Sequence, residues 1–168
     1  MSLSIHSVLV QGTVRSLRNM LIWLERAQAH ADAKKFDSSN YLAMRLAPDM
    51  LVFSSQVMIA CEIAKMGAAK LLGETAPALA QQDATLADLR VRIDQAISYL
   101  ESLDGPRLDA ASAPVVVERR GQSALDMSCN DYVQNWSQPN FFFHTTMTYA
   151  LLRHAGVDLG KADYLGIY

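Results

Sequence analysis

Residues 48–73 read PDMLVFSSQVMIACEIAKMGAAKLLG and carry the clearest helix pattern of the chain. Apolar or small side chains recur every three or four positions along this stretch, at Leu51, Ser54, Met58, Cys61, Ala64, Ala68 and Leu71. That spacing places them on one face of an α-helix. Pro48 suits the first helical turn, because its missing amide would be unpaired there. Gly73 suits a left-handed cap. The pattern predicts a helix from Pro48 to Leu72 with one buried face.

Three further stretches show the same helical spacing of apolar residues. They cover residues 5–31, 86–100 and 128–155. Thr85 with Asp88, and Ser128 with Asp131, have the spacing of capping pairs at the start of the last two. Pro139 lies inside the last stretch, so we expect a kink or a break there, because proline removes a backbone hydrogen bond. The glycine and aromatic residues of 157–168 predict an irregular C-terminal segment.

A short segment between the third and fourth helices has a different pattern. Residues 115–117 are three valines, residues 118–121 read ERRG, and Ser123, Leu125 and Met127 alternate with other residues. This pattern predicts a small β-hairpin that packs against the helices. Four amphipathic helices can hide their apolar faces only together. The sequence therefore predicts an all-α, single-domain four-helix bundle over residues 1–168, with one longer crossover connection.

Composition excludes several classes of protein. The chain has 168 residues, of which 51% are hydrophobic and 19% charged, and its formal net charge is −2. A basic surface for nucleic acid or for a membrane is therefore not expected. No apolar run approaches the roughly 18 residues of a membrane span, and the N-terminus lacks the basic region of a signal peptide. Cys61 and Cys129 lie far apart and are expected as two buried thiols, so we predict a cytoplasmic protein.

His144 is the candidate functional residue that the pattern singles out. It follows Phe141, Phe142 and Phe143, which wrap more than half of the helix circumference and predict burial on more than one side. Asn140, His144 and Thr148 form one polar ridge at positions i, i+4 and i+8. The ridge is either a hydrogen-bonded ladder in the core or part of a ligand or metal pocket, because buried polar groups require partners.

The second helix adds further polar candidates. Gln56 is flanked by apolar residues, so it either points inward or lies partly exposed. Glu62 is a possible carboxylate ligand, although an exposed position with Lys65 or Lys70 nearby is the simpler interpretation. Arg45 and Asp49 are four residues apart around Pro48, and a salt bridge at the helix start is preferred to an anion site.

Four segments of the chain resemble a known family. They are RLAPDM at 45–50, PNFFFH at 139–144, LLRHAGV at 151–157 and GKADYLG at 160–166. In this order they resemble an uncharacterised bacterial, DUF1993-like branch of the DinB/YfiT-like superfamily. The resemblance implies a four-helix bundle that is often dimeric. It also implies a zinc or nickel ion held by one histidine of the second helix and a His-x-x-x-His pair of the fourth, and in some members a thiol-dependent transferase or isomerase activity.

The sequence departs from that metal-binding pattern. On the fourth helix only His144 is present, with Asn140 and Thr148 one turn on either side, and the second helix has no histidine. Gln56 is the best match to the missing position. One imidazole with amide and hydroxyl groups binds zinc or nickel poorly. The divalent metal implied by the resemblance is therefore in doubt, and His144 would be its ligand if one is bound.

Two hypotheses for function follow from these residues. In the first, Gln56, Asn140 and Thr148 bind a small molecule in a pocket between the second and fourth helices, and His144 is the general acid or base. This pocket would resemble the site of a metal-dependent transferase or hydrolase without the full set of histidines. In the second, the chain is a non-catalytic, dimeric interaction or stress-related protein. A homodimer is expected in either case.

Overall fold

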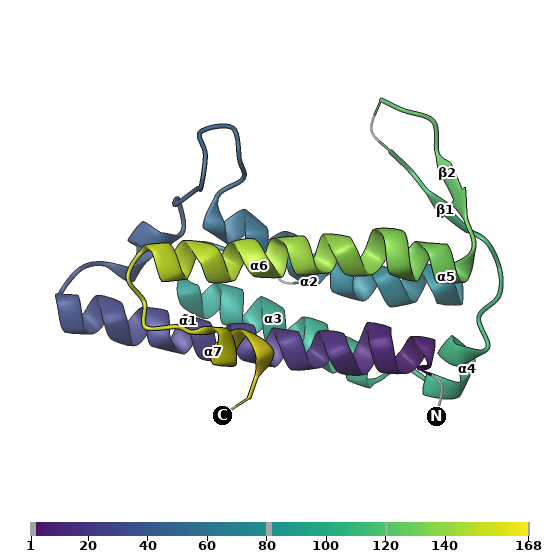
Figure 1. The fold of residues 1–168 in the computed structure, drawn as a ribbon, viewed down its shortest axis with the longest axis horizontal. Helices are drawn as coiled ribbons and strands as arrows, with labels where there is room; N and C mark the ends of the chain where they lie inside the picture. The colour runs from purple at the N-terminus through teal and green to yellow at the C-terminus, as the bar shows by residue number, and fades with distance from the viewer. Residues whose placement is uncertain (1–2, 80–81, 120, 168) are drawn as a thin grey trace.

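Four long helical segments lie side by side and form an all-α bundle in the computed structural model, which describes residues 3–79, 82–119 and 121–167 (Figure 1). Their bounds are α1 Thr13–Lys34, α2 Phe53–Leu72, α3 Leu86–Glu101 and α6 Gln138–His154. A π-helical turn, η1 Ser7–Gly12, leads into α1, and α5 Cys129–Asp131 with the π-helical η3 Tyr132–Ser137 leads into α6. The predicted fold class is thus confirmed.

Side-chain pairs between helices define the directions in which the helices run. Arg18 pairs with Glu101, and Arg90 pairs with Glu25, so α1 and α3 are antiparallel. The antiparallel pair α2 and α6 shares the most extensive helix–helix contact in the described part of the chain. Figure 1 shows α2 and α3 running in the same direction. The connection between α2 and α3 is therefore the crossover of the bundle, although it is shorter than the connection between α3 and α6.

The predicted helix boundaries agree with the structure at the caps. The Thr85 hydroxyl accepts from the amide of Asp88 at 3.0 Å, and the Ser128 hydroxyl accepts from that of Asp131 at 3.2 Å. Gly73 ends α2 with a φ of +67°, where a side chain would be strained. These caps satisfy amide and carbonyl groups that a helix end leaves without partners.

The predicted start of α2 at Pro48 is wrong. The helix begins at Phe53, and residues 47–50 form a turn closed by a hydrogen bond from the Met50 amide to the Ala47 carbonyl. The amide of Phe53 instead donates to Met44, at 2.8 Å, and that of Ser54 donates to Leu42. These carbonyls, which come from the preceding loop, satisfy the first amides of the helix. Leu51 therefore lies outside α2 and is 49% exposed.

Of the kink or break expected at Pro139, the break is wrong, because the chain stays helical from Cys129 to His154. Figure 1 shows α5 and α6 as one continuous run. The π-helical turn η3 ends just before Pro139. A wider turn leaves room for the proline ring, which would otherwise press on the carbonyl of the preceding turn. The sequence places the disturbance correctly, but the helix accommodates it without breaking.

The small hairpin between α3 and α6 is confirmed. β1 Val115–Val117 pairs antiparallel with β2 Leu125–Met127, and Val115 lies opposite Met127. Val115 and Val117 are buried, whereas Val116 is exposed. The hairpin and the loop before α2 project from the same long side of the bundle, at opposite ends (Figure 1).

Three short helices complete the connections and the tail. They are η2 Ser38–Tyr41, α4 Gly105–Asp109 and α7 Lys161–Leu165. The helix α7 corrects the expectation of an irregular tail. The Asn19 amide donates to the Tyr164 carbonyl at 3.0 Å, and the Trp23 indole donates to that of Asp163 at 3.2 Å. These two bonds hold α7 against α1.

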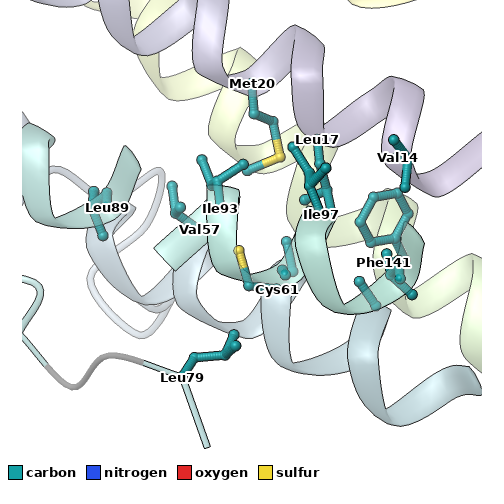
Figure 2. Packing of buried hydrophobic residues seen from close by; sticks show 14 of the residues in the cluster. Val14, Leu17, Met20, Val57, Cys61, Leu79, Leu89, Ile93, Ile97 and Phe141 are labelled. Atoms are coloured by element: carbon teal, nitrogen blue, oxygen red, sulfur yellow. The ribbon is translucent and has the colours of Figure 1, made fainter. Parts of the chain in front are cut away.

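Apolar side chains of the four long helices meet in one core (Figure 2). Leu17, Met20, Val57, Cys61, Ile93 and Phe141 are among them. The predicted face of α2 is correct over its second half, because Cys61, Ala64 and Ala68 are buried. Both cysteines are buried free thiols, as predicted. None of the helices in the described ranges has the length and hydropathy needed to cross a bilayer.

Candidate functional site

His144 lies in the second turn of α6 and faces α2. Its Nδ1 atom is 2.7 Å from Oε1 of Gln56, which projects from the first turn of α2. Gln56 is only 1% exposed, whereas His144 is half-buried. The inward orientation of Gln56, one of the two alternatives from the sequence, is thus correct. The expected burial of His144 is only partly correct, because its ring lies at the edge of the α2–α6 contact.

The hydrogen bonds around Gln56 determine which ring nitrogen of His144 carries the proton. The Gln56 amide nitrogen donates to the carbonyl of Leu51 at 3.1 Å, and a carbonyl can only accept. The amide oxygen of Gln56 must therefore face His144, and Nδ1 of His144 must be the donor. In the neutral ring Nε2 then carries a lone pair. In the described part of the chain Nε2 makes no hydrogen bond.

Burial keeps the His144 ring neutral. Desolvation lowers the pKa of His144 below its ordinary value of 6.5, because the charged ring would lose hydration. Its side-chain partner Gln56 is an uncharged amide, which does not offset that loss. The edge-to-face contact with Phe143, at 5.2 Å between ring centroids, adds an apolar neighbour. At neutral pH His144 therefore presents a basic nitrogen without a positive charge.

The polar ridge on α6 is not a ladder of side chains. Thr148 is fully buried, and its hydroxyl donates to the backbone carbonyl of His144 at 2.9 Å. Asn140 is half-buried, and its side chain has no hydrogen bond within the described ranges. Thr148 thus supports the backbone that carries His144, and Asn140 is the member of the ridge with free donors and acceptors.

Only one of the three phenylalanines before His144 is buried. Phe141 is in the core, whereas Phe142 is 40% exposed and Phe143 is 50% exposed. The single chain therefore covers only one side of this helix, and contact of its other side with a further partner, such as a second subunit, stays a prediction. Three successive residues point in directions about 100° apart, and the bundle covers only one of those directions.

The comparisons with known proteins agree with this architecture. The family model described as "Domain of unknown function (DUF1993)" matches residues 5–165. The chain belongs to the DUF1993 family. A solved structure of a DinB family member protein from Shewanella denitrificans is similar to this DUF1993 chain at 34% identity and a TM-score of 0.87, covering 96% of this chain and 92% of that one. No curated protein matches the chain.

The donors around His144 in this DUF1993 chain do not fit a zinc or nickel ion. The Gln56 oxygen and the Thr148 hydroxyl are both engaged in other hydrogen bonds. Among residues 3–79, 82–119 and 121–167, no group of three histidine, cysteine, aspartate or glutamate side chains could hold a metal ion. Both metals prefer several nitrogen, sulfur or carboxylate ligands. The residues around His144 therefore do not fit the metal site that the family resemblance implies.

Glu62 of the DUF1993 chain belongs to an ionic cluster on the opposite side of α2. Its carboxylate lies 2.9 Å from Nζ of Lys65 and 3.4 Å from the guanidinium of Arg92. Arg92 also forms two hydrogen bonds, of 2.7 and 2.8 Å, with Asp83. Lys65 and Arg92 are both about 5% exposed. Lys65 is thus the lysine that lies near Glu62, of the two that the sequence offered, and the engagement of Glu62 in this cluster removes it from any site with His144.

The sequence analysis did not predict that Lys65 and Arg92 are buried. Arg92 directly precedes Ile93, and Lys65 follows Ala64, so each charge lies beside the apolar face of its helix. This position beside the apolar face was the feature of the sequence that could have indicated their burial.

The salt bridge expected between Arg45 and Asp49 is not formed. Arg45 instead donates to the Pro48 carbonyl at 3.2 Å.

Proposed function

We propose that this DUF1993 chain binds an uncharged small molecule at His144, and that Nε2 of His144 accepts a hydrogen bond or a proton from it. The observation that supports the proposal is the chain of hydrogen bonds from Leu51 through Gln56 to Nδ1 of His144. It fixes the tautomer in which Nε2 is the acceptor. A general base requires this combination of an oriented ring and a free lone pair.

The surroundings of His144 favour a ligand with an apolar body. Leu51, whose carbonyl holds Gln56, is 49% exposed, and Phe143, which contacts the ring of His144, is 50% exposed. Apolar side chains next to a few oriented polar groups are typical of small-molecule sites. The neutral state of His144 disfavours a simple anion. Asn140, one turn before His144, supplies a second polar contact.

A spectroscopic titration of His144 tests this proposal directly. The ring nitrogens of the uniformly ¹⁵N-labelled protein report the tautomer and any new hydrogen bond. Phenol and anisole serve as probes, because both have an aromatic body and only phenol has a proton to donate. We expect phenol at millimolar concentration to shift the Nε2 resonance of His144, and anisole to leave it unchanged. A proton on Nε2, or equal responses to both probes, contradicts the proposal.

An interaction between two copies of the chain is the second candidate. The exposed rings of Phe142 and Phe143 lie next to one another in sequence on α6, and an apolar patch of this kind is characteristic of an interface. Sedimentation velocity at micromolar concentration would show a dimer that Phe143→Ser weakens. The matched control is Val91→Ser on α3, which removes a side chain that is 49% exposed elsewhere. A monomer at every concentration contradicts this candidate.

A further inference from the structure

A second histidine lines a cavity at the end of the bundle where α1 stops. The cavity has a volume of about 490 Å³ and is lined by Arg26, Ala29, His30, Gly156 and Asp158. Arg26 and His30 are one turn apart on α1, whereas Gly156 and Asp158 follow the end of α6. None of these residues belongs to the group around His144.

The ring of His30 is held by aromatic neighbours. Its Nδ1 atom is 2.6 Å from the hydroxyl of Tyr41, and its ring contacts Phe36 edge-on at a centroid distance of 5.8 Å. Phe36 and Tyr41 also pack against one another, at 5.5 Å. Such contacts reduce the freedom of the ring to turn, so Nε2 of His30 keeps a fixed position.

The partner of Nδ1 determines the tautomer of His30. Tyr41 is only 2% exposed, and His30 is the one acceptor that its hydroxyl has among the described residues. Burial raises the pKa of Tyr41, so the hydroxyl keeps its proton. An unpaired buried donor costs about 1–3 kcal/mol. Tyr41 therefore donates to Nδ1, and the proton of the neutral His30 ring is on Nε2. This is the opposite tautomer to that of His144.

The backbone at Gly156 leaves the Nε2 side of His30 open. Gly156 has a φ of +91°, and a Cβ atom added there would lie 3.7 Å from Nε2. A side chain would be strained at this φ, and its Cβ atom would already be in contact with the ring of His30. Glycine at this position keeps the N–H of His30 accessible from the cavity.

The charged residues of the cavity carry both signs. The guanidinium of Arg26 is anchored by Asp163, at 2.8 Å, and by the carbonyl of Asp158, at 3.0 Å, which leaves further N–H groups free. The Asp158 carboxylate has no hydrogen bond or ion pair within the described ranges. A simple anion would be repelled by Asp158, and a simple amine would leave the donors of Arg26 and His30 unused.

We propose that this cavity binds a small zwitterion of the free amino acid class. The carboxylate of the ligand accepts from Nε2–H of His30 and from the free N–H groups of Arg26, and its ammonium group pairs with the Asp158 carboxylate. A ligand with both charges is complementary to this mixed lining. A volume of about 490 Å³ is ample for such a molecule.

Titration of His30 with free amino acids tests the proposal. Pools of the twenty amino acids are added at millimolar concentration to the ¹⁵N-labelled full chain, and the Nε2–H signal of His30 is followed. We expect at least one pool to shift this signal, whereas acetate and methylamine at the same concentration do not. Absence of a shift with every pool, an equal shift with acetate, or a proton on Nδ1 overturns the proposal.

A substitution at Asp158 adds a second test, in a variant that is expected to keep the fold. Asp158 is exposed and its carboxylate is unpaired in the described structure, so Asp158→Asn should fold normally. It should weaken binding of the active amino acid by about tenfold or more, as expected for loss of a charge-assisted contact. Asp126→Asn, at an exposed position on β2, is the matched control and should bind normally. Equal binding by both variants overturns the assignment of Asp158.

Discussion

Gln56 and His144 are 88 residues apart in the sequence and share a hydrogen bond of 2.7 Å. The carbonyl of Leu51 orients the amide of Gln56, and the amide in turn orients the ring of His144. One backbone oxygen in the loop before α2 thus decides which nitrogen of a histidine on α6 is basic. The consequences of this relationship can be measured.

Replacement of Gln56 by leucine should destabilise the protein and allow the proton of the neutral His144 ring to occupy either ring nitrogen. Nδ1–H of the half-buried His144 would lose the acceptor that the buried Gln56 provides, which costs about 1–3 kcal/mol of unfolding free energy. Urea unfolding measures that loss, and ¹⁵N spectroscopy should show a proton appearing on Nε2. Gln134→Leu, at an exposed position of η3, is the control and should leave both unchanged. Equal unfolding free energies for the two variants would contradict the structural assignment.

The stability of the protein should depend on the protonation of His144. Its folded pKa is below the ordinary value of 6.5, so below that pH the unfolded state binds more protons than the folded state. The free energy of unfolding should therefore fall as the pH drops below about 6.5, and His144→Gln should remove this part of the dependence. Urea unfolding between pH 5 and 7.5 measures the difference, with the exposed His154→Gln as control. If the wild-type protein instead gained stability relative to His144→Gln on acidification, the predicted direction of the pH dependence would be wrong.

Loss of Arg92 should cost far more than loss of Arg90, two residues away on α3. Arg92 is buried and holds Asp83 and Glu62, so Arg92→Ala leaves Asp83 without its partner, leaves Glu62 with Lys65 alone, and should cost about 3–5 kcal/mol. Arg90 pairs with Glu25 in solvent, and Arg90→Ala should cost about 0–1 kcal/mol. Thermal and urea unfolding of both variants measure the contrast. Similar losses would mean that the cluster around Arg92 contributes no more than a surface pair.

Alanine substitutions at two glycines in helical turns, Gly67 and Gly12, should change the stability of the protein in opposite directions. A Cβ atom on Gly67 would lie 2.5 Å from the hydroxyl oxygen of the buried Ser137, so Gly67→Ala should cost about 1–3 kcal/mol. A Cβ atom on Gly12 would meet only ordinary contact at 3.7 Å, so Gly12→Ala should be stabilising by up to about 1 kcal/mol. Ser137→Gly should restore stability in the Gly67→Ala background. No recovery in that double variant would exclude this contact as the cause.

The local features of the fold could be predicted because they depend on neighbouring residues. The apolar spacing along α2, the capping side chains of Thr85 and Ser128, and the valine run of β1 each act within a few residues. The error at the start of α2 lies where residues outside the helix intervened. The loop carbonyls of Leu42 and Met44 took the first amides of α2 and moved its start to Phe53. A π-helical turn absorbed Pro139 without a break.

The candidate residues could be proposed from the sequence, and their role as a site stays a prediction, whereas their geometry came only from the fold. Composition and spacing led to Gln56, Asn140, His144 and Thr148, and to the absence of the histidines that the metal-binding pattern requires. The hydrogen bond between Gln56 and His144, the orientation of Thr148 toward the backbone, and the burial of Arg92 emerged only in the folded chain. Helical periodicity specifies which residues share a face of their own helix. Which helices are neighbours, and at what register, depends on side-chain packing between segments far apart in the chain, and that packing decides the partner of each polar group.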